Sequence, residues 1–142
     1  MKHIVSAIIF LTCLFASICI GSKEANSPVL TLEVLRSTTE WTPSKIRNMI
    51  SRVSYLYDYP EKSLNSLALA ESSFRHNVVG DGGFAYGLYQ YHKLTWISFT
   101  KKYGLEGFNI KDPVDQTVTT IEALKDNQHC HWTPLRKSNN CL

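Results

Sequence analysis

Apolar residues recur at helical spacing in several segments of this chain of 142 residues. Thr42 and Pro43 are residue types preferred at the N-cap and the first position of a helix. The apolar positions that follow at helical spacing are Ile46, Met49, Ile50, Val53 and Leu56. Asp112-Pro113 predicts another helix start, and its apolar positions are Val114, Val118, Ile121 and Leu124. Residues 117–120 have poor helix propensity, so tertiary packing must stabilise them.

A further helix is predicted from Glu61, and its apolar face contains a carboxylate. Leu64, Leu67, Ala68 and Glu71 stand at i, i+3, i+4 and i+7, which places them on one narrow face. A carboxyl group held against a core loses hydration, so its pKa rises and it keeps the proton that a general acid needs. Two structural alternatives remain open at this stage. Glu71 could be neutralised by a Lys or Arg partner, or lie where the apolar face reaches solvent.

A glycine-rich segment, residues 77–90, follows this helix and reads Asn-Val-Val-Gly-Asp-Gly-Gly-Phe-Ala-Tyr-Gly-Leu-Tyr-Gln. Three glycines around Asp81 predict a loop of tight turns with positive φ. Gly87 is expected to open the next element and to let backbone approach a ligand, while the Gln90 amide suits hydroxyl or acetamido groups. Beyond it, residues 94–103 favour a helix, although the alternation Leu94, Trp96, Ser98 leaves a strand open. The segment therefore predicts a polar groove.

The N-terminal segment predicts export. Residues 4–20 form an apolar run behind Met1-Lys2-His3, which is typical of a secretory signal peptide, here assigned to residues 1–22. An uncleaved membrane anchor is the alternative, because the run is long for a signal. Removing 22 of 142 residues leaves 120, which is enough for one domain. We expect residues 23–40 to form an N-terminal arm, loose or with a short strand at 29–32, and residues 41–142 to form a single, mainly α domain.

Cysteine usage fits an oxidising compartment, periplasmic or extracellular. Cys130 and Cys141 are the only cysteines left after removal of the signal peptide, and they are expected to pair. The short loop that they close contributes about 3 kcal/mol by loop-closure entropy. A metal site formed by His129, Cys130, His131 and Cys141 is the less favoured alternative, because adjacent residues of an extended chain point in opposite directions. We expect no metal site.

The residues around Glu71 and Gln90 resemble two motifs of the lysozyme-like lytic transglycosylases and their relatives, the goose-type lysozymes. Ala70-Glu71-Ser72-Ser73-Phe74 looks like the family's glutamate-serine motif, and Gly87-Leu88-Tyr89-Gln90 looks like its Gly-Leu-Met-Gln motif. Either motif alone is weak, but together, in this order and with a Gly-Asp-Gly-Gly turn between them, they are specific. The resemblance extends from about Trp41 to Trp132. It implies a single lysozyme-like helical domain.

The resemblance also implies a site and a substrate. Glu71 is the catalytic residue, acting as acid and then as base. The residues implied along the substrate groove are Ser72, Asp81, Tyr86, Gly87, Leu88, Gln90 and Trp132. The implied substrate is the glycan strand of peptidoglycan, and no metal or organic cofactor is implied. The protein is expected to be a monomer.

The net charge of +3 agrees with such a substrate, because cell-wall glycan strands carry carboxylates on lactyl and peptide groups. The positive charges are scattered along the chain, without the clustered basic and aromatic stripe that a nucleic-acid binder needs. We therefore expect no nucleic-acid partner.

Several positions depart from the family pattern. Tyr89 replaces the usual Met, and Ala85 stands where many members carry Ser. His92 lies close to the position where goose-type lysozymes place an aspartate that positions water. The C-terminal Tyr-Asn-x-Gly motif is missing, so aromatic support for Glu71 must come from Trp132 or from the loop tyrosines.

The chemistry depends on whether a second carboxylate takes part, because glycosidases ordinarily use two. Asp81 is the nearest candidate, and its favoured alternative is an Asx-turn residue that accepts bonds from neighbouring amides. Without a second carboxylate, the resemblance implies the transglycosylase route to a 1,6-anhydro product. With Asp81, the protein would be a hydrolytic lysozyme.

Two other classes of function remain open. The chain could be a non-catalytic wall-binding protein on the same fold, or a small secreted helical domain whose similarity is incidental. If it is an enzyme, its role could be wall remodelling, lysis, or service to a secretion or conjugation machinery as partner. The sequence does not choose among these roles.

Overall fold

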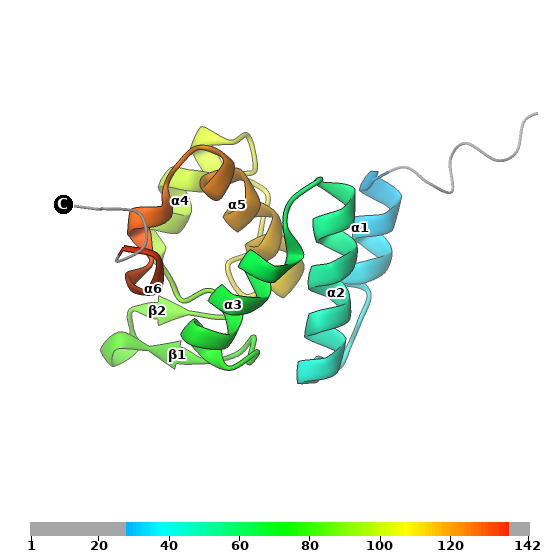
Figure 1. Cartoon of the computed structure of the whole chain (residues 1–142), viewed down its shortest axis with the longest axis horizontal. Coiled ribbons are helices and arrows are strands. Elements are labelled where there is room, and N and C mark those ends of the chain that lie inside the picture. The colour runs from blue at the N-terminus through cyan, green and yellow to red at the C-terminus, as the bar shows by residue number, and fades with distance from the viewer. Residues whose placement is uncertain (1–27, 137–142) are drawn as a thin grey trace, which may run out of the picture.

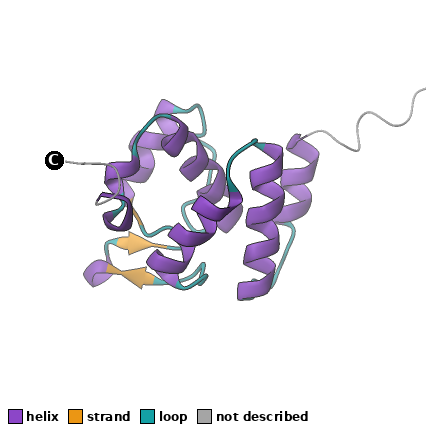
Figure 2. Ribbon diagram, viewed as in Figure 1, coloured by secondary structure: helices purple, strands orange, loops and turns teal. Residues whose placement is uncertain are grey.

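The computed structural model describes residues 28–136, which form a mainly helical chain (Figures 1 and 2). In chain order the elements are α1 (Pro28–Arg36), α2 (Pro43–Leu56), α3 (Glu61–Ser72), β1 (Val79–Gly80), the 3₁₀ turn η2 (Asp81–Gly83), β2 (Ala85–Tyr86), β3 (Tyr91–His92), α4 (Lys93–Lys102), α5 (Pro113–Lys125), the 3₁₀ turn η3 (His129–His131) and α6 (Thr133–Arg136). The predicted mainly α fold is confirmed. The predicted signal peptide lies outside the described residues. No helix between residues 28 and 136 has the length and apolar character needed to cross a bilayer.

The N-terminal arm is a helix over its described part, so the expected loose arm or short strand at 29–32 is wrong. Helix α1 lies beside α2 in Figure 1 and contacts both α2 and α5. Leu32 and Leu35 are both buried. They stand three residues apart, which puts them on one face of a helix, whereas in a strand they would point to opposite faces. Tertiary packing against α2 therefore decides the structure of this short segment.

Helices α2 and α3 form where the sequence predicts them. Thr42 Oγ1 accepts a hydrogen bond from the Lys45 amide at 3.3 Å, which is the expected N-cap contact. Helix α2 packs against both α3 and α5. Leu64, Leu67 and Ala68 are buried on α3, so its predicted apolar face is confirmed.

The glycine-rich segment contains a small antiparallel sheet that the sequence did not predict. Its strand order is β1-β2-β3, with Gly80 paired to Ala85 and Ala85 paired to His92. Each strand has two residues, which is too short to show an alternating pattern. Gly87, with φ of 79°, lies in the turn between β2 and β3 and does not open a new element. The expected tight turns with positive φ are present at Asp81 and Gly82 as well.

Helix α5 is buried along most of its length and keeps its helical form despite its threonines. Asp112 is the N-cap, and its Oδ1 accepts from the Val114 and Asp115 amides at 2.8 and 3.1 Å. The buried hydroxyls of Thr117 and Thr119 donate to carbonyls four residues earlier in the helix. Thr117, Thr119 and Thr120 are all buried, which agrees with the expected role of packing in this stretch.

An aromatic cluster attaches the C-terminal segment to the domain. Residues 93–102 form the helix α4, so the alternative of a strand there is wrong. The Tyr91 ring makes edge-to-face contacts with Trp96 at 5.2 Å and Trp132 at 5.6 Å between centroids. Its hydroxyl and the Thr120 hydroxyl lie 3.0 Å apart, within hydrogen-bond distance. These contacts place the short helix α6 beside the sheet, where it also contacts α3.

Candidate active site

Glu71 lies in the last turn of α3, and the backbone just after it holds two unusual conformations. Ser73, the C-cap, and Phe74 have φ of 53° and 61°, in the left-handed region where non-glycine residues are uncommon. The Phe74 ring is buried, and the Arg47 guanidinium lies 4.1 Å from its centroid. This cation–π contact holds the turn in place. The turn that follows Glu71 is therefore anchored to α2 through Arg47.

The Glu71 carboxyl group is half-buried, and burial raises its pKa above the ordinary value. Among residues 28–136, no side chain or backbone group forms a hydrogen bond or ion pair with this carboxyl. The alternative of a Glu neutralised by a Lys or Arg partner therefore does not hold within the described residues. The group is desolvated and unpartnered, which favours its protonated form.

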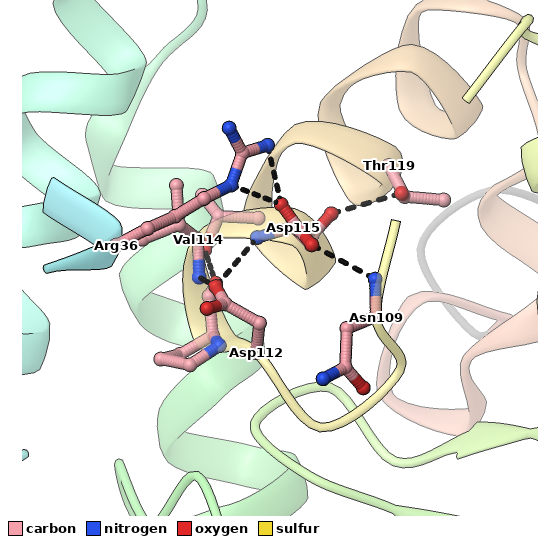
Figure 3. Close-up of polar contacts among 8 residues, drawn as sticks. Arg36, Asn109, Asp112, Val114, Asp115 and Thr119 are labelled. Carbon is pink, nitrogen blue, oxygen red and sulfur yellow. Dashed lines mark hydrogen bonds and ion pairs between the residues drawn. The ribbon is translucent and has the colours of Figure 1, made fainter. Parts of the chain in front are cut away.

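Asp115 on α5 is a second buried carboxylate, and unlike Glu71 it has hydrogen-bond partners in the described part of the chain (Figure 3). Its Oδ1 accepts from Arg36 Nε at 2.7 Å and Nη2 at 2.5 Å, and its Oδ2 accepts from the Asn109 amide at 2.8 Å. Burial raises the pKa of Asp115 on balance, and the hydrogen bonds from Asn109 and Arg36 reduce that rise without cancelling it. Asp115 therefore ties α1 and the loop before α5 together.

Asp81 and His92 are unrelated positions in the sequence pattern, but in the structure they contact each other. Asp81 Oδ2 lies 3.0 Å from His92 Nε2, and both side chains are exposed, 65% and 52%. The sheet register explains the contact, since Asp81 follows Gly80 on β1 and His92 ends β3. Within the described chain, the Asp81 carboxylate accepts no bond from neighbouring amides, so the Asx-turn interpretation is wrong.

The Gln90 amide is used to organise the loop itself. Its Nε2 donates to the carbonyls of Gly87 at 2.7 Å and Val78 at 3.3 Å. A Cβ on Gly80 would lie 2.3 Å from Gln90 Oε1. Gly80 has an ordinary φ of −114°, which any residue can adopt, so a side chain there would meet only the end of the Gln90 side chain and would displace it from its two hydrogen bonds. Gln90 is part-buried and lines a pocket with His92.

Gln116 on α5 is a key residue of this region that the sequence did not single out. Its Oε1 accepts from the Tyr89 amide at 2.9 Å, and its Nε2 donates to the carbonyl of Tyr86 at 3.0 Å and also to that of Ile110. A Cβ on Gly87 would lie 2.1 Å from Gln116 Nε2. The close approach expected at Gly87 is therefore made by the protein's own Gln116. The sequence feature that could have identified Gln116 is its place as a polar residue between Val114 and Val118, on a helix predicted to pack in the core.

The other predicted groove residues differ in exposure. Leu88 and Trp132 are buried, and Trp132 Nε1 donates to the Tyr89 carbonyl at 3.0 Å. Ser72 is buried and its hydroxyl donates to the Ala68 carbonyl within α3. Tyr86 is partly exposed and lines a second pocket with Gly87. Substrate contact by any of these residues stays a prediction. The side chains of Leu88, Trp132 and Ser72 are buried, so in this structure they act on a substrate only by positioning neighbouring groups.

The C-terminal cysteines are described only in part. Cys130 lies in η3 and is disulfide-bonded, while its predicted partner Cys141 lies outside the described residues, so the pairing stays a prediction. Within residues 28–136 no group of three His, Cys, Asp or Glu side chains is arranged to hold a metal ion.

Glu71 stands at the end of a helix and is followed by a small sheet with a Gly-Leu-Tyr-Gln turn. A comparison of the sequence with models of known protein families gives a match over this region. The model of the transglycosylase SLT domain matches residues 48–131, a span that contains Glu71, the sheet and Gln116. Neither the curated proteins nor the solved structures gave a match. The matched span covers more than half of the chain. The chain therefore belongs to the SLT transglycosylase domain family, whose members cleave glycosidic bonds of peptidoglycan.

Proposed function

We propose that this protein is a peptidoglycan lytic transglycosylase in which Glu71 is the general acid and then the general base. The observation that carries the proposal is the half-buried carboxyl of Glu71 at the end of α3, which has no partner among residues 28–136 and whose pKa is raised by burial. A protonated carboxyl at this place can protonate the glycosidic oxygen between N-acetylmuramic acid and N-acetylglucosamine. General acid catalysis of this kind contributes about 10²–10⁴-fold to the rate.

The reaction needs no second enzyme carboxylate if the substrate supplies the nucleophile. Glu71 donates its proton to the glycosidic oxygen, and the C1–O bond breaks to release N-acetylglucosamine with a free 4-hydroxyl. The acetamido group of the muramyl residue stabilises the positive centre at C1. The 6-hydroxyl oxygen then bonds to C1, and the Glu71 carboxylate accepts its proton. The enzyme returns to its starting state, the product is a 1,6-anhydromuramyl ring, and no water is consumed.

The Asp81–His92 contact supports this route over hydrolysis. A lysozyme-type mechanism needs a carboxylate that positions or activates water. The Asp81 carboxylate is 3.0 Å from the His92 imidazole, so one of its oxygens is already engaged. No other carboxylate stands in a motif that the family uses. We therefore propose anhydro products as the main outcome, with hydrolysis through Asp81 as the alternative.

The test is mass spectrometry of the products released from purified peptidoglycan. An anhydromuramyl product is lighter than the hydrolytic one by one water, so the two routes give different masses. We expect anhydro ends, at unchanged proportion in Asp81→Asn. Predominantly reducing ends that disappear in Asp81→Asn would make the protein a lysozyme and refute the transglycosylase route.

A zymogram with purified cell wall separates an enzyme from a non-catalytic wall-binding protein. The proposal expects a cleared zone for the wild type, whereas a binding protein would be retained on walls in a pull-down and clear nothing. We further propose that the protein acts outside the cytoplasm, because the predicted signal peptide and the predicted Cys130–Cys141 pair both suit an exported protein. We also propose that it acts as a monomer.

A further inference from the structure

A polar pocket of about 320 Å³ lies between β3, the start of α4 and the C-terminal segment. Its polar lining residues are Gln90, His92, Thr95, His131, Thr133 and Arg136. None of the lining residues is acidic. The pocket therefore offers hydrogen-bond donors around a fixed positive charge, since an arginine is charged at every physiological pH.

Arg136 is held in a defined place at this pocket. Its Nε donates to the Cys130 carbonyl at 2.7 Å, which fixes the plane of the guanidinium. Among residues 28–136, no carboxylate lies within ion-pair distance of Arg136. Within the described part of the chain, the terminal nitrogens therefore have no carboxylate partner. Arginine suits a planar carboxylate ligand because it can bind both oxygens at once.

The neighbouring imidazoles complete the site as hydrogen-bonding groups. Burial, and then the nearby Arg136 charge, lower the pKa of His131, so this ring is mainly neutral at neutral pH. Its ring packs edge to face on Phe99 at 4.6 Å between centroids. His92 is engaged with Asp81 through Nε2 and also lines the pocket. Arg136 is therefore the main source of positive charge there.

The pocket lies next to elements of the proposed active site. Gln90, of the Gly-Leu-Tyr-Gln turn, is one of its lining residues. The short helix α6, which supplies Thr133 and Arg136, also contacts α3, the helix that carries Glu71. A ligand group that extends sideways from a glycan in the groove could reach it.

We propose that this pocket is an anion subsite, the Arg136 pocket, that binds a carboxylate attached to the muramyl residue of the glycan. The inference rests on the proposed function for the identity of the glycan. The carboxylate can come from the stem peptide or, in strands without peptide, from the free lactyl group. Both sources present the same chemistry, and neither exists on a glycan made only of N-acetylglucosamine.

The test measures the affinity of the protein for three disaccharides by NMR chemical-shift titration. They are N-acetylglucosaminyl-N-acetylmuramic acid with its stem peptide, the same disaccharide with a free lactyl carboxylate, and N,N′-diacetylchitobiose (chitobiose below), which is neutral and has no carboxylate. None contains a bond from muramic acid to a following sugar, so the binding result does not depend on cleavage. If the zymogram fails while this binding succeeds, the catalytic proposal falls and the subsite stands.

We expect at least one carboxylate ligand to bind about tenfold more tightly than chitobiose, which is typical of one charge-assisted contact. The stronger of the two identifies the peptide or the lactyl source. Arg136→Ala should remove this preference. Lys101→Ala is the matched control, because it removes one positive charge from an exposed position on α4 outside the pocket, and it should retain the preference.

Thr133→Asp provides a second variant in case Arg136→Ala disturbs the C-terminal segment. Thr133 is exposed at the first position of α6, where an acidic residue is tolerated, and a carboxylate there would repel the ligand without removing the Arg136–Cys130 contact. It should also remove the preference. Equal binding of all three disaccharides by the wild type, no binding of either carboxylate ligand, or an unchanged preference in both Arg136→Ala and Thr133→Asp would overturn the proposal.

Discussion

The first turn of α5 and the last turn of α3 both hold polar side chains against the core, but their surroundings differ. In α5, Asp115 and Gln116 have partners from three other parts of the chain, among them Arg36 and the Tyr89 amide. In α3, the Glu71 carboxyl is desolvated and has no partner among residues 28–136. Partnered groups stabilise the fold, whereas an unpartnered acid remains available for chemistry.

Gln116→Ala is expected to have the largest effect on stability. It leaves the Tyr89 amide and two carbonyls without partners and opens a cavity, which together cost about 3 kcal/mol or more. Urea unfolding measures the loss, and Gln128→Ala, at a more exposed amide, should cost far less. In the Gln116→Ala background, Gly87→Ala should cost less than in the wild type, because the 2.1 Å clash is removed. Additive effects would contradict this account of Gly87.

Asp115→Asn is expected to rank second. The Asn side chain has no negative charge and only one acceptor oxygen, so it loses the ion pair with Arg36 and cannot accept from both Arg36 and the Asn109 amide. The unfolding free energy should therefore fall by about 2–3 kcal/mol. The activity of the folded fraction should remain, because the Asp115 carboxylate is bonded to Arg36 and the Asn109 amide and forms no bond with Glu71 or Gln90. Thermal or urea unfolding measures the loss of stability, and peptidoglycan solubilisation by the folded protein measures the retained activity. An unchanged transition would show that the Arg36–Asp115 contact in Figure 3 contributes nothing.

Glu71→Gln is expected to change stability less, and in a direction set by pH. Because burial raises the pKa of Glu71 in the folded state, folding favours its protonated form. Below the unfolded-state pKa of about 4.3 the carboxyl is protonated in both states, and the variant should match the wild type. As pH rises through the higher folded-state pKa, the wild type loses stability relative to Glu71→Gln, which carries no charge to desolvate. Unfolding at several pH values measures the difference, and a wild type that gained stability over this range would reverse the argument.

Asp126→Asn should have the smallest effect. Asp126 is fully exposed, and hydrogen bonds from Lys102 and then Tyr103 lower its pKa. Its contribution is therefore present above the unfolded-state pKa and is lost as pH falls through the lower folded-state value. At neutral pH the variant should be nearly as stable as the wild type, because exposed ion pairs contribute little. A loss as large as that of Asp115→Asn would contradict the distinction between buried and exposed carboxylates.

The sequence predicts the parts of this molecule that depend on regular periodicity. The N-cap Thr42, the start of α5 at Asp112 and the apolar face that includes Glu71 all follow from spacing and capping chemistry. The pairing of Asp81 with His92 does not, because it depends on the register of strands with two residues each. The partner of Gly87 could not be predicted either, since Gln116 lies 29 positions away on another helix. Long-range polar contacts of this kind leave no periodic signal.

The most direct test of the central claim is solubilisation of purified peptidoglycan by Glu71→Gln at matched folded fraction. We expect activity to fall by about 10²–10⁴-fold while the variant remains folded, because a single acid carries the proton transfer. Asp115→Asn, corrected for its lower stability, should keep its activity in the same assay. Activity retained by Glu71→Gln would contradict the claim that the unpartnered carboxyl of α3 is the proton donor.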